Sequence, residues 1–232
     1  MSISPDDDMF FNKPVVELPK ITAPTAAEIC EKSKPSPEGK ALLKADMKPA
    51  EYQAALEKNK MSVDSVHFLA HGLPAKDAIC WACQACGLIR PKLSLPELDC
   101  LKFTEMWLKN PIPDLMASIS LSIGKIDFTG PGSWAAQAAL WIALPGLCAG
   151  AVVGAILLAA GLKVGVAMPP IPKPKLEVPM IPFPPELLLQ FQMPQLPPIP
   201  PLPVLDQPKL MKLLLPFIDL GKGVAIGTIK CC

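Results

Sequence analysis

Residues 147–162 read LCAGAVVGAILLAAGL, a run of sixteen residues that contains no charged side chain. A helix that is apolar on every side is buried, either in a protein core or in a membrane. At about 1.5 Å per residue the run is about 24 Å long, short of the roughly 30 Å hydrocarbon core of a bilayer. Half of its residues are Ala or Gly, which add little to membrane insertion and allow close helix packing. The run therefore predicts a buried helix of a helical bundle.

The residues directly before this run also lack charged side chains. No charge occurs over 128–162, and Gly130-Pro131-Gly132-Ser133 predicts a turn that starts a helix over 134–144. Pro145-Gly146 is expected to break that helix before the apolar run begins. Two apolar helices in succession also fit a membrane hairpin over 134–162, so a membrane-inserting protein or effector is the alternative function.

Helix start and stop signals predict further helices on both sides of the apolar pair. Ser94-Leu95-Pro96-Glu97 is a capping box with Pro in the first turn, which is typical of a helix N-terminus. Near the C-terminus, an amphipathic helix that Pro216 is expected to kink is predicted by the spacing of Leu210, Leu213, Leu214 and Phe217. The other predicted helices run from Thr22 or Thr25 to Ile29, from Pro49 to Asn59, from Ser62 as the N-cap to Gly72, and from Pro74 to Leu88, and the capping box opens one through Trp107; a short segment over 115–123 follows.

A proline-rich apolar segment separates the apolar run from the last predicted helix. Fifteen of the thirty prolines lie between Pro169 and Pro208. Repeated Pro favours extended, polyproline-like backbone that cannot join a central sheet. Because the apolar side chains of this segment gain by leaving water, we expect an extended arm that lies on a partner or on the bundle itself. The candidate partner-binding residues are Phe183, Leu187, Leu188, Phe191 and Met193.

These patterns predict a mostly α protein, an irregular helical bundle with a long proline-rich extended arm before the last helix. A length of 232 residues suits one core with additional arms. The expected parts are an N-terminal extended arm over 1–21, a helical bundle over 22–168, the proline-rich apolar arm over 169–208, and a C-terminal helix and tail over 209–232 that packs on the bundle.

Composition narrows the possible partners and the compartment. The chain has 22 basic and 21 acidic residues, a net charge of +1, so a nucleic-acid partner is disfavoured. Asp6-Asp7-Asp8 stands where a signal peptide needs positive charge followed by an apolar stretch, which predicts a cytoplasmic protein. Membrane contact is possible but not favoured, and the sequence does not indicate an oligomeric state.

Few residues are candidates for chemistry. His67 and His71 share a helix face and are followed by Cys80, Cys83 and Cys86, a set of residue types that suits zinc. On one helix, residues spaced by three drift about 60° per step around the axis, so the three thiols do not readily converge on one tetrahedral ion. We therefore expect no metal site. No nucleophile elbow or phosphate-binding glycine loop occurs, so no catalytic residue and no cofactor are predicted, and the protein is expected not to be an enzyme.

Several stretches share their order and spacing with a known family. They are Met47-Lys48-Pro49-Ala50-Glu51-Tyr52, then Phe68-Leu69-Ala70-His71-Gly72-Leu73-Pro74 continuing to Ala78-Ile79-Cys80-Trp81-Ala82-Cys83, then Pro131-Gly132-Ser133-Trp134-Ala135-Ala136 through Trp141, and finally Gly154-Ala155-Ile156-Leu157-Leu158-Ala159-Ala160 with Gly221-Lys222-Gly223-Val224-Ala225-Ile226-Gly227. On these stretches the chain resembles an uncharacterised helical family encoded beside bacterial type VI secretion genes, over 45–162 and 207–227. The family-like motif residues are Phe68, His71, Pro74, Trp81, Cys83, Trp134 and Trp141.

The resemblance implies a helical bundle and a biological context, contractile injection, and supplies no catalytic residues. We expect a non-enzymatic accessory, adaptor or structural component of a bacterial type VI or related contractile injection system. Its expected partner is a spike, baseplate or cargo protein, bound through the proline-rich arm. The expected location is the cytoplasm, with assembly into the apparatus or export with it. The arm departs from the family pattern, in which a short connection precedes the last helix.

Overall fold

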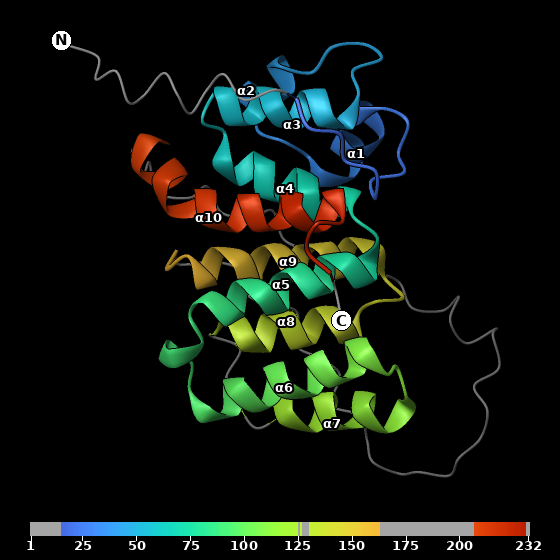
Figure 1. The fold of residues 1–232 in the computed structure, drawn as a ribbon, viewed down its shortest axis with the longest axis vertical. Coiled ribbons are helices and arrows are strands. Elements are labelled where there is room, and N and C mark those ends of the chain that lie inside the picture. Colours follow the sequence, from blue (N-terminus) through green and yellow to red (C-terminus); the bar gives the residue numbers. More distant parts are fainter. Residues whose placement is uncertain (1–14, 125, 127–129, 163–206, 231–232) are drawn as a thin grey trace. The chain divides into compact units, whose positions relative to one another are not determined.

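The computed structural model describes residues 15–124, 126, 130–162 and 207–230, and within these residues the chain is a bundle of ten α-helices without strands (Figure 1). The predicted mostly α fold is confirmed. The helices are α1 (Ala26–Ser33), α2 (Pro37–Ala41), α3 (Pro49–Lys58), α4 (Ser62–Gly72), α5 (Ala75–Leu88), α6 (Leu95–Lys109), α7 (Pro113–Ile123), α8 (Pro131–Leu140), α9 (Pro145–Ala159) and α10 (Gln207–Ile226), with a 3₁₀ turn at Arg90–Lys92.

The apolar run forms α9, which lies at the centre of the bundle. It packs against α8, α5 and α4, so partners surround it on several sides. Ten of its fifteen residues are buried: Cys148, Ala149, Ala151, Val152, Val153, Gly154, Ala155, Ile156, Leu157 and Ala159. Burial against other helices accounts for the absence of charge from this helix without a bilayer. Among the described residues, no helix is both long enough and apolar enough to span a membrane.

The central helices alternate in direction. In Figure 1, α5, α7 and α9 run one way across the bundle, and α6, α8 and α10 run the other way. Short connections between successive helices produce this arrangement for α5 to α9, as expected for antiparallel neighbours. The connection between α9 and α10 is the exception, because it contains residues 163–206.

The predicted boundary between the two apolar helices is wrong in its detail. The first helix ends at Leu140 instead of Leu144, and Pro145 begins α9 instead of only breaking α8. Proline is well suited to the first helical position because its missing N–H has no intrahelical partner there. Cys148 N–H then donates to the carbonyl of Leu144 at 2.9 Å, which closes the first turn of α9.

Two other helix starts differ from the prediction. Ser62 is the first residue of α4 and not its cap, which is Met61. Residues 113–123 form α7, which the sequence patterns do not reveal because three Ser residues interrupt them. In the helix, Ser118 Oγ donates to the carbonyl of Asp114 and Ser122 Oγ to that of Ser118, so these hydroxyls bond to the preceding turn. Ile119 is buried, and the helix packs against α6 and α8.

Among the other start and stop signals, those of α3 and α6 are confirmed. The prediction is wrong for the end of α1, which continues past Ile29 to Ser33, and for the start of α8, which is Pro131 within the predicted turn. Pro49 begins α3 and Asn59 is its C-cap, while Ser94 and Glu97 form the capping box of α6. Ser94 N–H donates to Glu97 Oε2 at 3.1 Å. These signals depend on contacts within one turn, which the sequence specifies directly.

The two arms are described only in part. Residues 15–21 contain no helix, as predicted, but Leu18 and Ile21 are buried. The last helix begins at Gln207, two residues before the expected boundary, and continues through Pro216 to Ile226. The proline-rich arm up to residue 206, including Phe183, Leu187, Leu188, Phe191 and Met193, lies outside the described residues, whereas Gln207 and Pro208 belong to α10 and not to an extended arm. All described helices belong to one unit of the chain, which combines residues before 163 with residues after 204.

Candidate functional site

The candidate functional site is the junction at which α10 docks on the rest of the bundle. We call the described residues before 163 the body, and the contacts of α10 with it the α10 junction. The helix packs mainly against α4 and α5. Its apolar face turns inward at Leu210, Leu214 and Phe217, as predicted. Leu213, predicted to share this face, is 43% exposed, so the prediction is wrong for that residue. Its buried residues are Leu210, Met211, Leu214, Phe217, Ile218, Gly221, Gly223, Val224 and Ala225.

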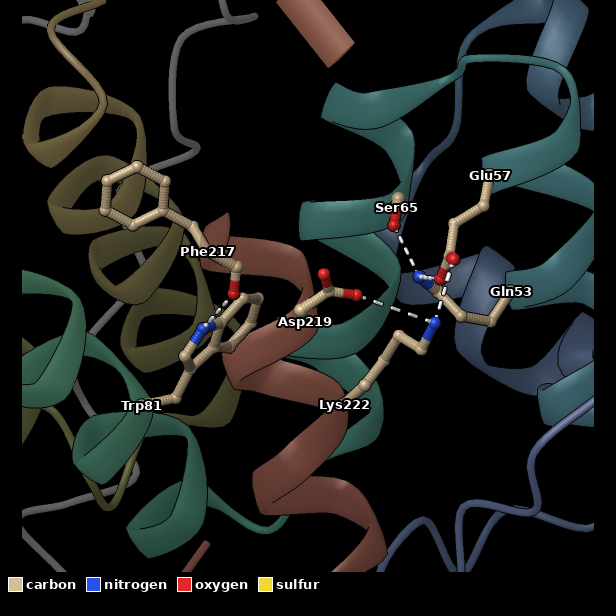
Figure 2. Close-up of polar contacts among 7 residues, drawn as sticks. All are labelled: Gln53, Glu57, Ser65, Trp81, Phe217, Asp219 and Lys222. Atoms are coloured by element: carbon tan, nitrogen blue, oxygen red, sulfur yellow. Dashed lines mark hydrogen bonds and ion pairs between the residues drawn. The ribbon is translucent and has the colours of Figure 1, made fainter. Parts of the chain in front are cut away.

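Trp81 of α5 is the main apolar anchor of the junction. Its side chain is fully buried, and its Nε1–H donates to the carbonyl oxygen of Phe217 at 2.8 Å (Figure 2). In a helix that carbonyl also faces the N–H of Gly221, one turn later. A Cβ added to Gly221 would lie 2.5 Å from Cε2 of Trp81, so only glycine lets the indole reach the helix backbone. The fit joins two of the family-like stretches.

A partly buried ionic network forms the second contact. Lys222 Nζ lies 2.8 Å from Glu57 Oε2, and the two side chains are 17% and 18% exposed. Glu57 Oε1 accepts a hydrogen bond from Gln53 Nε2 at 2.9 Å, and the same amide also donates to Ser65 Oγ (Figure 2). Asp219, one turn before Lys222, lies 3.9 Å from its ammonium group. The network therefore joins α10 to α3 and α4 through the mostly buried Lys222 and Glu57, while Asp219 at its edge is 49% exposed.

A backbone hydrogen bond forms the third contact. Lys20 N–H donates to the carbonyl of Ala225 at 3.0 Å, and Lys20 Nζ also forms an ion pair with Asp77 of α5 at 2.7 Å. The segment before α1 is thus held against the last turn of α10. With Trp81 and Glu57, it gives α10 three separate hydrogen-bonded attachments, each to a different part of the body.

A second tryptophan-glycine contact holds the central helices together. Trp134 of α8 is 4% exposed, and its indole lies directly against Gly154 of α9. A Cβ at Gly154 would overlap the six-membered part of that ring. The sequence predicts close packing at the small residues of the apolar run, and the structure shows that Trp134 is the neighbour of Gly154.

The other family-like motif residues serve the packing of α4, α5 and α8. Phe68 is fully buried and meets the ring of Tyr52 edge-on, with 5.0 Å between ring centroids. Pro74 is the N-cap of α5, Trp141 is the C-cap of α8, and Cys83 is buried in α5. These residues hold the scaffold in place and do not converge on one site.

The histidines and cysteines give no sign of a shared ion. Among the described residues, no group of three or more His, Cys, Asp or Glu side chains has a metal-binding arrangement. Cys86 is a buried free thiol, Cys83 is buried, and Cys80 is disulfide-bonded. Burial raises the pKa of the Cys86 thiol to about 12, so it is a poor nucleophile at neutral pH.

His71, in the last turn of α4, is expected to make stability depend on pH. Burial, with the nearby charges of His67 and Lys32, lowers the pKa of His71 from 6.5 to about 4. As the pH falls below 6.5, the unfolded chain therefore binds the proton before the folded chain does. The stability associated with neutral His71 is complete above pH 6.5 and declines as the pH falls towards 4.

When the pH is lowered from about 7 to about 4.5, the His71→Gln variant should therefore lose less stability than the wild type. The measurement is the free energy of unfolding in urea for both proteins at both pH values. Carboxylates that titrate in this range affect both proteins alike. The difference between the two proteins in how the free energy of unfolding changes with pH therefore measures the contribution of His71. Equal changes in the two proteins would show that the histidine titrates as it does in the unfolded chain.

Sequence reasoning finds the anchors of the junction but not its ionic network. Trp81 and the Gly221-Lys222-Gly223 stretch are in the family-like motifs, yet nothing in the sequence pairs Lys222 with Glu57. The pair is 165 residues apart in the chain. A weak signal exists in Gln53 and Glu57, which lie four residues apart and share a helix face. The predicted partner-binding residues remain outside the described part of the chain.

Comparison with known proteins gives a family but no function. No curated protein and no solved structure matches the chain. One sequence family, described as a family of unknown function, matches residues 52–167. The matched part contains α4 to α9 and most of α3, including Trp81, Trp134 and Gly154, and it ends before α10. Because this match covers 116 of the 232 residues, the chain belongs to DUF6931.

Proposed function

We propose that this protein is a non-enzymatic accessory or adaptor component of a bacterial type VI or related contractile injection system. In this proposal, it binds a spike, baseplate or cargo protein through the proline-rich arm. It acts in the cytoplasm, where the apparatus is assembled, and stays with the apparatus or leaves with its cargo.

The main support is that the described helices bury their own apolar faces. The core formed by α4, α5, α8, α9 and α10 includes the largest fully buried side chains, among them Trp81, Phe68, Ile156 and Leu214. The helices that form this core all lie outside residues 163–206. The apolar side chains of the arm are therefore available to a partner in our proposal.

The composition of the arm suits a binding segment. A proline-restricted backbone loses less conformational entropy on binding than a flexible one. Apolar anchors such as Phe183, Leu187 and Phe191 then fill pockets of an extended groove, as in other complexes of proline-rich segments. The adaptor context itself rests on the resemblance over 45–162 and 207–227.

The side chains that could take part in a reaction support a binding function in preference to catalysis. Lys222 and Glu57 neutralise each other, and Trp81 donates its only polar hydrogen to the backbone of α10. The thiols of Cys86 and Cys148 are buried, and burial raises the pKa of each to about 12. Each of these groups has a structural explanation.

Deleting residues 169–203 should abolish recovery of apparatus proteins while leaving the bundle folded. The experiment is an affinity purification from the native host, with tagged full-length and deleted chains compared by mass spectrometry. A spike, baseplate or cargo protein recovered by the full-length chain is then purified and titrated against both chains. We expect its affinity to fall by at least about tenfold, which corresponds to about 1.4 kcal/mol.

Matched substitutions distinguish partner binding through the arm from nonspecific binding to exposed apolar side chains. Phe183→Ser together with Phe191→Ser should weaken binding, whereas Leu95→Ser should not, although Leu95 is 79% exposed on the body. The thermal transition of each variant verifies that the bundle is folded. Equal recovery of the partner by the deleted chain, or recovery of no apparatus protein by the folded full-length chain, would contradict the proposal.

A further inference from the structure

We propose that Cys80 of α5 forms its disulfide with Cys231 or Cys232, and that this bond locks α10 onto α5 when the chain meets an oxidising environment. We call this bond the Cys80 disulfide. In the cytoplasm it is open, because glutathione and thioredoxin keep thiols reduced there, and it closes once the chain has left that compartment. This inference is independent of the proposed adaptor function, and its test uses the purified chain alone.

The first argument is the bonding state of Cys80. Its sulfur is in a disulfide bond, and the chain has eight cysteines in all. The other described cysteines, none of which is its partner, are Cys30, Cys83, Cys86, Cys100 and Cys148. Only the adjacent pair Cys231-Cys232 is left. Within one chain, the partner of Cys80 is therefore a member of this pair.

The second argument is the position of Cys80 beside the end of α10. Asp77, one turn earlier in α5, forms an ion pair with Lys20 at 2.7 Å, and the backbone N–H of Lys20 donates to the carbonyl of Ala225 at 3.0 Å. This part of α5 thus lies near the last turn of α10. Cys80 is three residues after Asp77, about 60° from it around the helix axis, and is 4% exposed.

The third argument is the course of the chain after α10. Gly227 has a φ of +87°, a left-handed conformation that glycine adopts readily and that ends the helix. The N–H groups of Gly227 and Ile229 then donate to the carbonyl of Gly223 at 3.1 and 3.0 Å. The chain is therefore held back against the last turn of α10 at Ile229. Lys230 follows, and consecutive Cα atoms are about 3.8 Å apart, so the cysteine pair begins close to this turn.

Closure consists of two thiol–disulfide exchanges, with a small disulfide such as oxidised glutathione as the oxidant. The thiolate of the partner cysteine attacks one sulfur of the oxidant, which forms a mixed disulfide and releases one glutathione thiolate. The thiolate of Cys80 then attacks the protein sulfur of that mixed disulfide and releases the second glutathione. The released thiolates take up the two protons that the protein thiols lose. Two protein thiols are thus oxidised while one glutathione disulfide is reduced to two thiols.

Other described thiols are poorly suited to this exchange. Burial raises the pKa of Cys86 and Cys148 to about 12 and that of Cys100 to about 11, and it also raises the pKa of Cys30. Few of these groups are thiolates at neutral pH, and the thiolate is the attacking species. The surface beside the cysteine pair is open by comparison, because Gly227, Thr228 and Lys230 are exposed.

The bond adds a lock to a junction that is also held without it. The contacts of α10 with Trp81, Glu57 and Lys20 involve no thiol, so we expect the reduced chain to stay folded with α10 docked. Cys80 and its partner are about 150 residues apart in sequence. A disulfide that closes so long a loop strongly restricts the unfolded chain, which is the main way in which disulfides stabilise proteins.

The test starts from the wild-type chain, equilibrated with mainly oxidised or with mainly reduced glutathione. The remaining thiols are alkylated under denaturing conditions, and the intact mass gives the number of alkyl groups. We expect eight groups, one for each cysteine, after reduced glutathione and two fewer after oxidised glutathione. In a digest of the oxidised chain, fragment ions should show Cys80 linked to Cys231 or Cys232.

Matched variants measure what the bond does. The melting temperature of the oxidised wild type should exceed that of the reduced wild type by at least about 5 °C. The double variant Cys231→Ser/Cys232→Ser should show no such difference. Cys86→Ala, which removes a buried thiol from the same helix as Cys80, should retain the difference in full.

Four results would overturn the proposal. They are eight alkyl groups on the folded chain after oxidised glutathione, two fewer groups already after reduced glutathione, a link from Cys80 to another cysteine or to a second chain, and an undiminished temperature difference in the double variant. The alkylation and digest use the wild-type chain only, so they decide the assignment even if a variant fails to fold.

Discussion

Gly154→Ala should lower the free energy of unfolding by about 1–3 kcal/mol, the usual cost of overpacking a core. The added methyl group would overlap the indole of Trp134, which is 4% exposed and has no room to turn away without moving α8 from α9. In an open helical position the same change is favourable, because Ala stabilises helices by about 1 kcal/mol relative to Gly. The expected change in the free energy of unfolding therefore has the opposite sign to the change that helix propensity predicts.

Gly150 provides the matched control for this prediction. It lies one turn earlier in α9, and a Cβ added there meets no atom within 4 Å. Gly150→Ala should therefore raise the free energy of unfolding by up to about 1 kcal/mol. Urea unfolding of the two variants and the wild type, at one pH, gives both differences. Two changes of the same sign would mean that Trp134 does not pack on Gly154.

Trp81→Ala should be the most destabilising single substitution of the α10 junction, at about 3–5 kcal/mol. It removes a fully buried indole that packs on Gly221, and it removes the donor to the carbonyl of Phe217. Because α10 relies on this anchor, hydrogen exchange of its amides should become faster than that of α9. Leu88→Ala, in the same helix but at a 52% exposed side chain, should cost no more than about 0.5 kcal/mol.

A double-mutant cycle connects this effect to the glycine. Gly221→Ala alone should be destabilising because of its contact with the indole, but in the Trp81→Ala background the same change should be neutral or stabilising. A non-additivity of about 0.5–3 kcal/mol is typical of residues in direct contact. Additive effects, or Trp81→Ala no more costly than Leu88→Ala, would show that α10 is not anchored at Trp81.

Helix starts marked by local chemistry could be predicted from the sequence. The capping box of Ser94 and Glu97 and the first turn at Pro49 are confirmed, because the groups involved lie within one turn of each other. The segment that forms α7 shows the limit of such signals. Its Ser118 and Ser122 are polar in sequence but bond to their own helix backbone, so the pattern does not reveal the helix.

At the α10 junction, the sequence identified Trp81 as a residue of interest but did not identify the residues that it contacts. The resemblance singled out Trp81, and the stretch over 221–227 includes the glycine on which it packs. Trp81 and Phe217 are 136 residues apart, and Glu57 and Lys222 are 165 apart. Pairing at such separations depends on how all the intervening helices pack, and no local rule specifies it.

The sequence by itself determined the fold class and predicted that the apolar run is a buried helix. Its position at the centre of the bundle comes from the structure. An uncharged run rich in Ala and Gly is stable only where other helices cover it, and its length favoured a protein core over a bilayer. Only the tertiary structure decided which side chains fill the small-residue surfaces, with Trp134 on Gly154 and Trp81 on Gly221. The physical reason is that hydrophobic burial is non-directional, whereas the fit of an indole against a glycine backbone requires one particular packing.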